Sequence, residues 1–163
     1  MRLRKGFGGF VFGLFFGVMV SSTGLANEAG GELSAPMKTV FQGYGGDTVY
    51  EGPRNGAVES LVGAHLRSWV ACEPKGYIQT VGGFIYDRLG GQTSAQAMRD
   101  GLESRYPGNP IARVVLLRVD GMGKGKAEAL YEAHHKDGTS VQRVLHIEMT
   151  QKGWRVVRVS KVR

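Results

Sequence analysis

The sequence predicts one α+β domain in which N-terminal helices pack on a curved, mostly antiparallel sheet. In the first part of this domain, apolar residues recur at three- and four-residue spacing, which is the period of a helix. The last third instead carries four alternating runs joined by short turns rich in Gly, Lys and Asp, a pattern typical of β-hairpins. Helices that come first and a meander of strands that comes last favour the α+β class.

The N-terminus has the layout of a secretory signal peptide. Three basic residues among the first five precede 21 uncharged residues, 6–26. The strongly apolar part, 10–20, is shorter than the roughly 20 residues that a membrane-spanning helix needs, and small residues at its end predict cleavage after Ala26. We therefore expect a signal peptide over 1–26 and a periplasmic or secreted protein. The alternative is an uncleaved leader that anchors the domain in the membrane.

Charge and cysteine content narrow the function classes. Residues 105–163 carry 12 basic and 5 acidic side chains, and such a basic region attracts anionic partners. The basic residues are scattered along strands without interleaved aromatic residues, so nucleic-acid binding is not predicted. Cys72 is the only cysteine, which excludes a disulfide within the chain. Its place near the end of an apolar helix predicts burial of the thiol.

The segment 27–56 is rich in Gly, Ser, Asn and Pro, which predicts a flexible lead-in with at most a short strand near 38–42 or 48–50. The domain itself is expected over 57–163. Its third helix is expected to begin at Thr93, whose capping-box partner is Gln96. The expected elements are, in order, helices over 57–72 and 75–81, an extended piece at 84–86, a helix after Thr93, and strands over 111–119, 125–135, 140–150 and 153–162.

Several motifs follow one another in an order that points to a known superfamily. A helical Trp, an acidic residue and a Tyr come first, then a Phe, and then strands with an aromatic pair and basic–aliphatic runs. These are Trp69, Glu73, Tyr77, Phe84, Tyr131, His135, 143–147 and 152–156. The pattern resembles the nuclear transport factor 2-like superfamily, also called SnoaL-like or ketosteroid-isomerase-like, with a cystatin-like α+β arrangement. It is most similar to the extracytoplasmic domain associated with bacterial L,D-transpeptidases.

The resemblance covers 57–162 and implies a cone-shaped half-barrel with a concave pocket between sheet and helices. The sequence departs from the family pattern at three positions. Glu73 stands for the usual Asp, Met98 for a Trp and His135 for a Tyr. The superfamily includes both enzymes and binding modules, so the fold does not choose between them.

A ligand pocket is the first candidate site. On strand 125–135, Tyr131 and His135 share one face with alternate alanines, and Arg143 shares the corresponding face of the next strand. By the resemblance, these three residues face the pocket opposite Trp69 and Tyr77. An arginine and a histidine beside aromatic walls would bind an anionic ligand. The alternative interpretation is structural, with Tyr131 in the core, His135 at a solvated strand end and Arg143 in an internal ion pair.

Catalytic and metal sites are weaker candidates. Asp87 lies near the position of the catalytic Asp in ketosteroid isomerases, so Asp87 and His135 are candidate catalytic residues, although Asp87 also opens a Gly-rich turn, where a solvated Asp is ordinary. His134, His146 and Glu148 offer zinc-type ligands, but their spacing matches no known motif, and neither a metal nor a cofactor is expected. The Gly-rich run 121–126 lacks the following helix of a phosphate loop and predicts a hairpin turn.

We therefore expect an exported, non-catalytic module that binds a partner through its pocket or its sheet. The expected partner is an envelope protein or a peptidoglycan-related molecule. Two alternatives stay open. One is a small-molecule isomerase or dehydratase-type enzyme of the same fold, and the other is a periplasmic component of a secretion-type assembly. The resemblance also implies a homodimer formed through the open face of the sheet.

Overall fold

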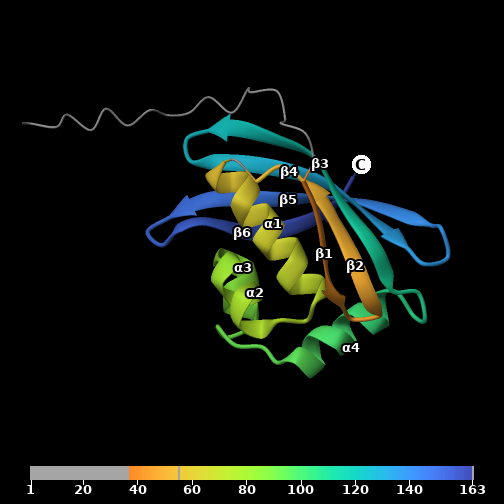
Figure 1. Cartoon of the computed structure of the whole chain (residues 1–163). Helices are drawn as coiled ribbons and strands as arrows, with labels where there is room; N and C mark the ends of the chain where they lie inside the picture. The colour runs from red at the N-terminus through yellow and green to blue at the C-terminus, as the bar shows by residue number, and fades with distance from the viewer. Residues whose placement is uncertain (1–36, 55, 163) are drawn as a thin grey trace, which may run out of the picture.

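The computed structural model describes residues 37–54 and 56–162, and Figure 1 gives its ribbon. Six strands and four helices form in these ranges, which confirms the α+β class. The expected signal peptide and the cleavage after Ala26 lie outside the described residues. In chain order the elements are β1 (Met37–Gly43), β2 (Gly46–Gly52), α1 (Ala57–Val70), α2 (Pro74–Thr80), α3 (Gly83–Arg88), α4 (Ala95–Arg105), β3 (Ile111–Gly123), β4 (Lys126–His135), β5 (Ser140–Thr150) and β6 (Gly153–Lys161).

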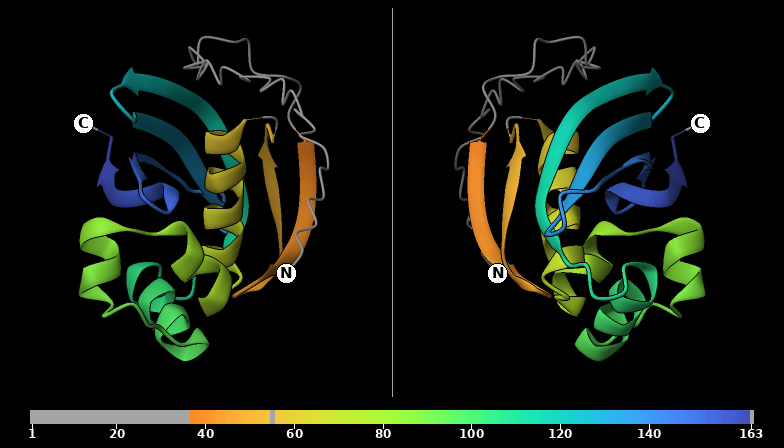
Figure 2. Two further views of the ribbon diagram at one scale, coloured as in Figure 1. Left: turned by 90° about the vertical axis from the view of Figure 1, so that its left-hand side faces the viewer. Right: turned by 90° about the vertical axis from the view of Figure 1, so that its right-hand side faces the viewer.

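The six strands form one sheet in the order β1-β2-β3-β4-β5-β6. Neighbouring strands are antiparallel except β2 and β3, which pair in parallel. The sheet curves around α1, and α2, α3 and α4 gather below it (Figure 2). The last four strands agree with the four that the alternation predicts. Across the described ranges, no helix is both long and apolar enough to cross a membrane.

The N-terminal hairpin corrects the expected lead-in, because residues 37–52 of that segment pair as β1 and β2 rather than forming a flexible tether. The hydroxyl of Thr48 donates to the carbonyl oxygen of Ile111 at 2.9 Å. Glu51 pairs with Arg113 at 2.7 Å and with Lys38 at 3.3 Å. Ile111 and Arg113 lie on β3, about sixty positions further along the chain, so local composition could not reveal these two contacts.

Helix α1 carries the core stripe that its periodicity predicts. Val62, Leu66 and Val70 are at most 1% exposed. Burial of each such side chain stabilises the fold by about 1.5–3 kcal/mol. Just after the helix, Cys72 adopts a left-handed backbone (φ 54°) and is 3% exposed, which confirms its predicted burial. That burial raises the pKa of the thiol, which makes it a poor nucleophile.

Two local predictions in the helical region are wrong. The expected extended piece at Phe84–Tyr86 lies inside α3. Gly83 has φ 49° and turns the chain away from β6 directly after Gly82 has donated to the carbonyl oxygen of Val156. The cap of α4 is also one residue later than expected, because the hydroxyl of Ser94, not Thr93, accepts from the amide of Ala97 at 3.1 Å.

The alternation of β4 predicts its buried face correctly, whereas that of β5 predicts only part of it. The five residues at alternate positions 127–135 are all buried. On β5, Leu145 and Ile147 are 1% exposed, but Met149 is 50% exposed and Arg143 is half-buried. The helices cover only the middle of this strand. The β3–β4 turn has positive φ at Lys124 and Gly125, as a two-residue type I′ hairpin requires, so the run 121–126 is a hairpin turn.

Candidate functional site

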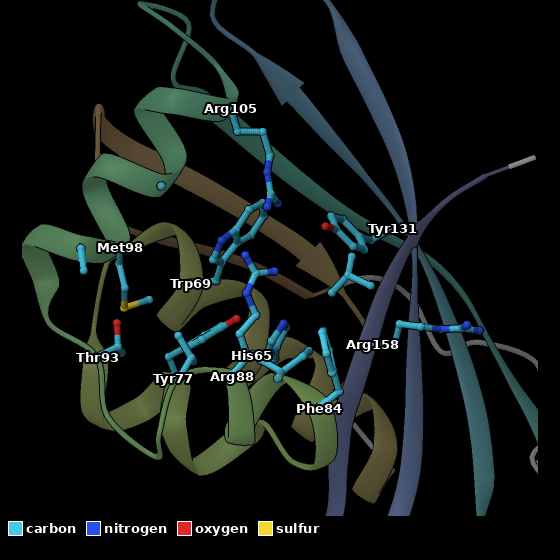
Figure 3. Close-up of a pocket in the computed structure, with 15 residues that line it drawn as sticks. His65, Trp69, Tyr77, Phe84, Arg88, Thr93, Met98, Arg105, Tyr131 and Arg158 are labelled. Atoms are coloured by element: carbon cyan, nitrogen blue, oxygen red, sulfur yellow. The ribbon is translucent and has the colours of Figure 1, made fainter.

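A cavity of about 510 Å³ lies between the helices and the concave side of the sheet. Figure 3 shows its lining, to which α1, α2, α3, α4, β4 and β6 all contribute. The lining includes several aromatic and basic side chains. They are His65 and Trp69 from α1, Tyr77 from α2, Phe84 and Arg88 from α3, Arg105 from α4 and Tyr131 from β4.

Three of the five residues predicted to form a ligand pocket line this cavity together. Trp69 and Tyr131 meet edge to face, with ring centroids 6.4 Å apart. Tyr77 stacks at a tilt on the imidazole of His65, with centroids 5.1 Å apart. These rings build an apolar wall with phenolic hydroxyls at its edge, which suits a flat or apolar ligand body.

The other two predicted pocket residues lie elsewhere, which corrects their placement. His135 is 4% exposed at the end of β4, where its ring packs 4.4 Å from that of Tyr106. Its Nδ1 lies 2.9 Å from the carbonyl oxygen of Asn109, so it donates there. Arg143 stands directly opposite the cavity residue Tyr131 in the β4–β5 register, and its charge offsets part of the rise in the pKa of that phenol, but Arg143 does not line the cavity. Strand β4 continues past Tyr131 to His135, so a residue on the same face as Tyr131 need not reach the cavity.

The candidate catalytic and metal-ligating residues do not converge either. Asp87 is exposed on α3 and does not line the cavity, because the segment is helical rather than extended. His146 lies opposite Glu128, and its Nδ1 donates to the carboxylate Oε1 of Glu128 at 2.9 Å, whereas His134 lies opposite Ser140 at the far end of the pair. Within 37–54 and 56–162, no three His, Cys, Asp or Glu side chains are grouped as metal ligands.

Two arginines that were not predicted point into the cavity. Figure 3 shows Arg88 rising from α3 and Arg105 descending from α4, both toward the indole of Trp69. Neither forms an ion pair with an acidic residue in the part of the chain that the structure describes. Arg158 also lines the cavity, but its guanidinium points away, toward the ring of His146 at 3.3 Å. Arg105 could have been found from the sequence, because it follows Leu102 by three residues on the stripe of α4.

The positive charge of Arg105 acts on both phenols of the cavity. Burial raises the pKa values of Tyr77 and Tyr131, and the guanidinium of Arg105 offsets part of that rise in each. Both hydroxyls therefore stay protonated at neutral pH and can donate hydrogen bonds. The cavity thus presents cationic and neutral donors, an arrangement that favours a negatively charged group.

His65 supplies an acceptor at the floor of the cavity. The hydroxyl of Thr80 donates to the carbonyl oxygen of Tyr77 at 2.7 Å, so in its 2.9 Å contact with Nδ1 of His65 it must accept. The imidazole therefore carries its proton on Nδ1 and leaves Nε2 as a bare acceptor. Complete burial lowers the pKa of His65 to about 3, which keeps the ring neutral.

No family model, no curated protein and no solved structure matches this chain. The function must therefore be argued from the chemistry of the cavity.

Proposed function

We propose that this protein is an exported, non-catalytic binding module of nuclear transport factor 2-like fold, and that its cavity binds an organic anion. The observation that carries the proposal is the pair of guanidiniums, Arg88 and Arg105, aimed from two helices over one aromatic wall without acidic partners among the described residues. The cone-shaped form of the fold is part of the proposal, supported by the curvature of the sheet around α1 (Figure 2).

The lining specifies three features of the ligand. The rings of Trp69, Tyr77 and Tyr131 favour an aromatic or apolar body of modest size. The two guanidiniums favour a carboxylate, phosphate or sulfonate at one edge, because arginine donates two parallel N–H groups to such oxyanions. The bare Nε2 of His65 favours an N–H or O–H donor on the ligand. A peptidoglycan fragment or a segment of an envelope protein can present such a combination, and both stay predictions.

Binding rather than catalysis is supported by the state and place of the titratable groups. A general base needs a pKa near the working pH, and that of His65 is held near 3 by burial. An isomerase or dehydratase was expected to use Asp87, Tyr131 or His135, and of these only Tyr131 lines the cavity. The secretion-assembly alternative and the homodimer stay predictions, because no observation on the described residues favours either.

The proposal can be tested with two fluorescent probes that differ in one charge. Anilinonaphthalene sulfonate and phenylnaphthylamine share an aromatic body and an N–H donor, but only the first carries a sulfonate. We expect the sulfonate to bind at least about tenfold more tightly, since a charge-assisted hydrogen bond contributes about 1.5–3 kcal/mol. Arg105→Gln and Arg88→Gln should each remove most of that preference while leaving binding of the neutral probe unchanged.

Arg99→Gln is the matched control, because Arg99 is exposed on α4 and does not line the cavity. It should bind both probes as the wild type does. The proposal fails if the two probes bind equally to the wild type, or if Arg99→Gln weakens sulfonate binding as much as Arg105→Gln does.

A further inference from the structure

A second cluster of polar groups lies on the other flank of α1. Four side-chain donor atoms there are buried and have no hydrogen-bond partner among the described residues. These are Oη of Tyr50, Nε and Nη2 of Arg54, and Nη1 of Arg67. Arg67 precedes the cavity residue Trp69 by two positions, which is roughly 200° around a helix. The cluster is therefore separate from the aromatic cavity.

Two of these groups meet above a glycine. The guanidinium of Arg67 lies over the ring of Tyr50, 5.3 Å from its centroid. A Cβ atom on Gly63 would lie 3.0 Å from Nη1 of Arg67 and 3.1 Å from Oη of Tyr50. A Cβ atom on Gly52 would come within 2.7 Å of the same hydroxyl. The lack of a side chain at both glycines thus lets the phenol approach the backbone closely, and at Gly63 the hydroxyl of Tyr50 and Nη1 of Arg67 come to the same place between α1 and β2.

Arg54 adds to this cluster the Nε–Nη2 edge of its guanidinium, which can bind an oxyanion. Its Nε–H and Nη2–H are the parallel donors with which a guanidinium binds a carboxylate or a phosphate in bidentate fashion, and these are the two buried atoms without a partner. The hydroxyl of Ser60 donates to the carbonyl oxygen of Arg54 at 3.0 Å, which holds the backbone of Arg54 against the first turns of α1.

Charge effects place the three side chains in one electrostatic environment. Burial raises the pKa of Tyr50 to about 12, and the charges of Arg67 and Arg54 lower it in part. Burial lowers the pKa of Arg67, and the charge of Arg54 lowers it further. Two like charges and a protonated phenol therefore share a desolvated region. Such an arrangement is unfavourable unless an anion accepts from it.

The nearby carboxylate does not neutralise the cluster. Glu59 acts on Tyr50, whose pKa its charge raises. It forms no ion pair with Arg54 or Arg67 in the described part of the chain. A compensating negative charge must then come from outside these residues.

We infer that Tyr50, Arg54 and Arg67 form a binding site for a small oxyanion, either a phosphate or a carboxylate. The phenol donates one hydrogen bond, Arg67 donates one from Nη1, and Arg54 donates two from its Nε–Nη2 edge. The site is independent of the proposed aromatic cavity, so either can fail without the other.

The test measures the melting temperature of the purified protein during titration with inorganic phosphate, sodium acetate or sodium chloride at constant ionic strength. A ligand that binds only the folded state raises the melting temperature in a saturable way. We expect saturation with phosphate or with acetate, which identifies the anion, and no such effect with chloride. Amide chemical shifts should move at Gly63 during the same titration.

Three variants make the assignment specific. Arg54→Gln should weaken the apparent affinity at least about tenfold, whereas Arg99→Gln should leave it unchanged. Tyr50→Phe should be at least as stable as the wild type without the anion, because it removes a buried donor that has no partner, and less stable than the wild type at saturation. Glu59→Gln should bind the anion more tightly, because a competing negative charge is removed.

The inference is overturned if neither phosphate nor acetate raises the melting temperature beyond the chloride control. It is also overturned if Arg54→Gln keeps the full shift, or if Tyr50→Phe is destabilised equally with and without the anion.

Discussion

Replacement of His65 by Asn should change how the stability of the protein depends on pH. Unfolding returns the pKa of His65 from about 3 to its ordinary 6.5. Below pH 6.5 the unfolded chain therefore binds a proton that the folded chain does not, and the free energy of unfolding falls as the pH falls toward 3. The slope approaches about 1.4 kcal/mol per pH unit, which amounts to about 2 kcal/mol between about pH 7 and about pH 5.

Asparagine is the substitution of choice because its side-chain N–H can still donate to the hydroxyl of Thr80, whereas it does not titrate. His65→Asn should be less stable than the wild type at neutral pH, since it leaves part of a buried volume unfilled. The difference between the two proteins should then shrink by about 2 kcal/mol on going to about pH 5.

Urea denaturation followed by circular dichroism at several pH values measures the free energy of unfolding of the wild type and of His65→Asn. Leu66→Ala is the control, because Leu66 is the buried neighbour of His65 and carries no titratable group. Leu66→Ala should lower the free energy of unfolding by about 2–5 kcal/mol, and this loss should be the same at every pH. A difference between His65→Asn and the wild type that stays constant from neutral to acidic pH would refute a neutral, desolvated imidazole.

Further predictions concern helix and turn chemistry. Ser94→Ala should lower the free energy of unfolding by about 1 kcal/mol, because it removes the acceptor for the amide of Ala97, whereas Thr93→Ala should leave the cap intact. Gly125→Ala should cost about 1–2 kcal/mol, since φ is +71° there. Gly101→Ala should instead stabilise the protein by about 0.5–1 kcal/mol, because Gly101 is helical and no atom lies within 4 Å of its added methyl. Thermal or chemical denaturation checks each value.

The parts of the fold that were predictable from the sequence are those whose periodicity arises from burial on one side. The stripe of α1 and the alternation of β4 between Ala127 and His135 both face a continuous core. The β1–β2 hairpin was missed because its stability depends on β3, through contacts such as Thr48 with Ile111. The aromatic and β-branched run in α3 favours a strand locally. The positive φ of Gly83 turns the chain away from β6, to which Gly82 is hydrogen-bonded, and a helix begins there.

The candidate site was predictable only where a residue sits on a covered face. Trp69, Tyr77 and Tyr131 lie where the helices face the sheet. The periodicity of the helices and strands was therefore enough to predict that these three side chains line one pocket. Arg88 comes from a segment whose secondary structure was predicted incorrectly. His65 lies on the buried face of α1, where its spacing alone gives it no chemical role. Its partner Thr80 lies fifteen residues away on another helix, and only the tertiary structure brings the two within 2.9 Å.

The parallel pairing of β2 with β3 sets an order of events for the growing chain. All four helices lie between these two strands in the sequence, so the hairpin has no sheet to join until Ile111 and its neighbours have been made. Such a distant pairing forms slowly, because a long loop must close before its contacts form. A chain that emerges N-terminus first thus exposes an edge strand early and completes its structure late. The native state is therefore reached only after most of the polypeptide has been synthesised.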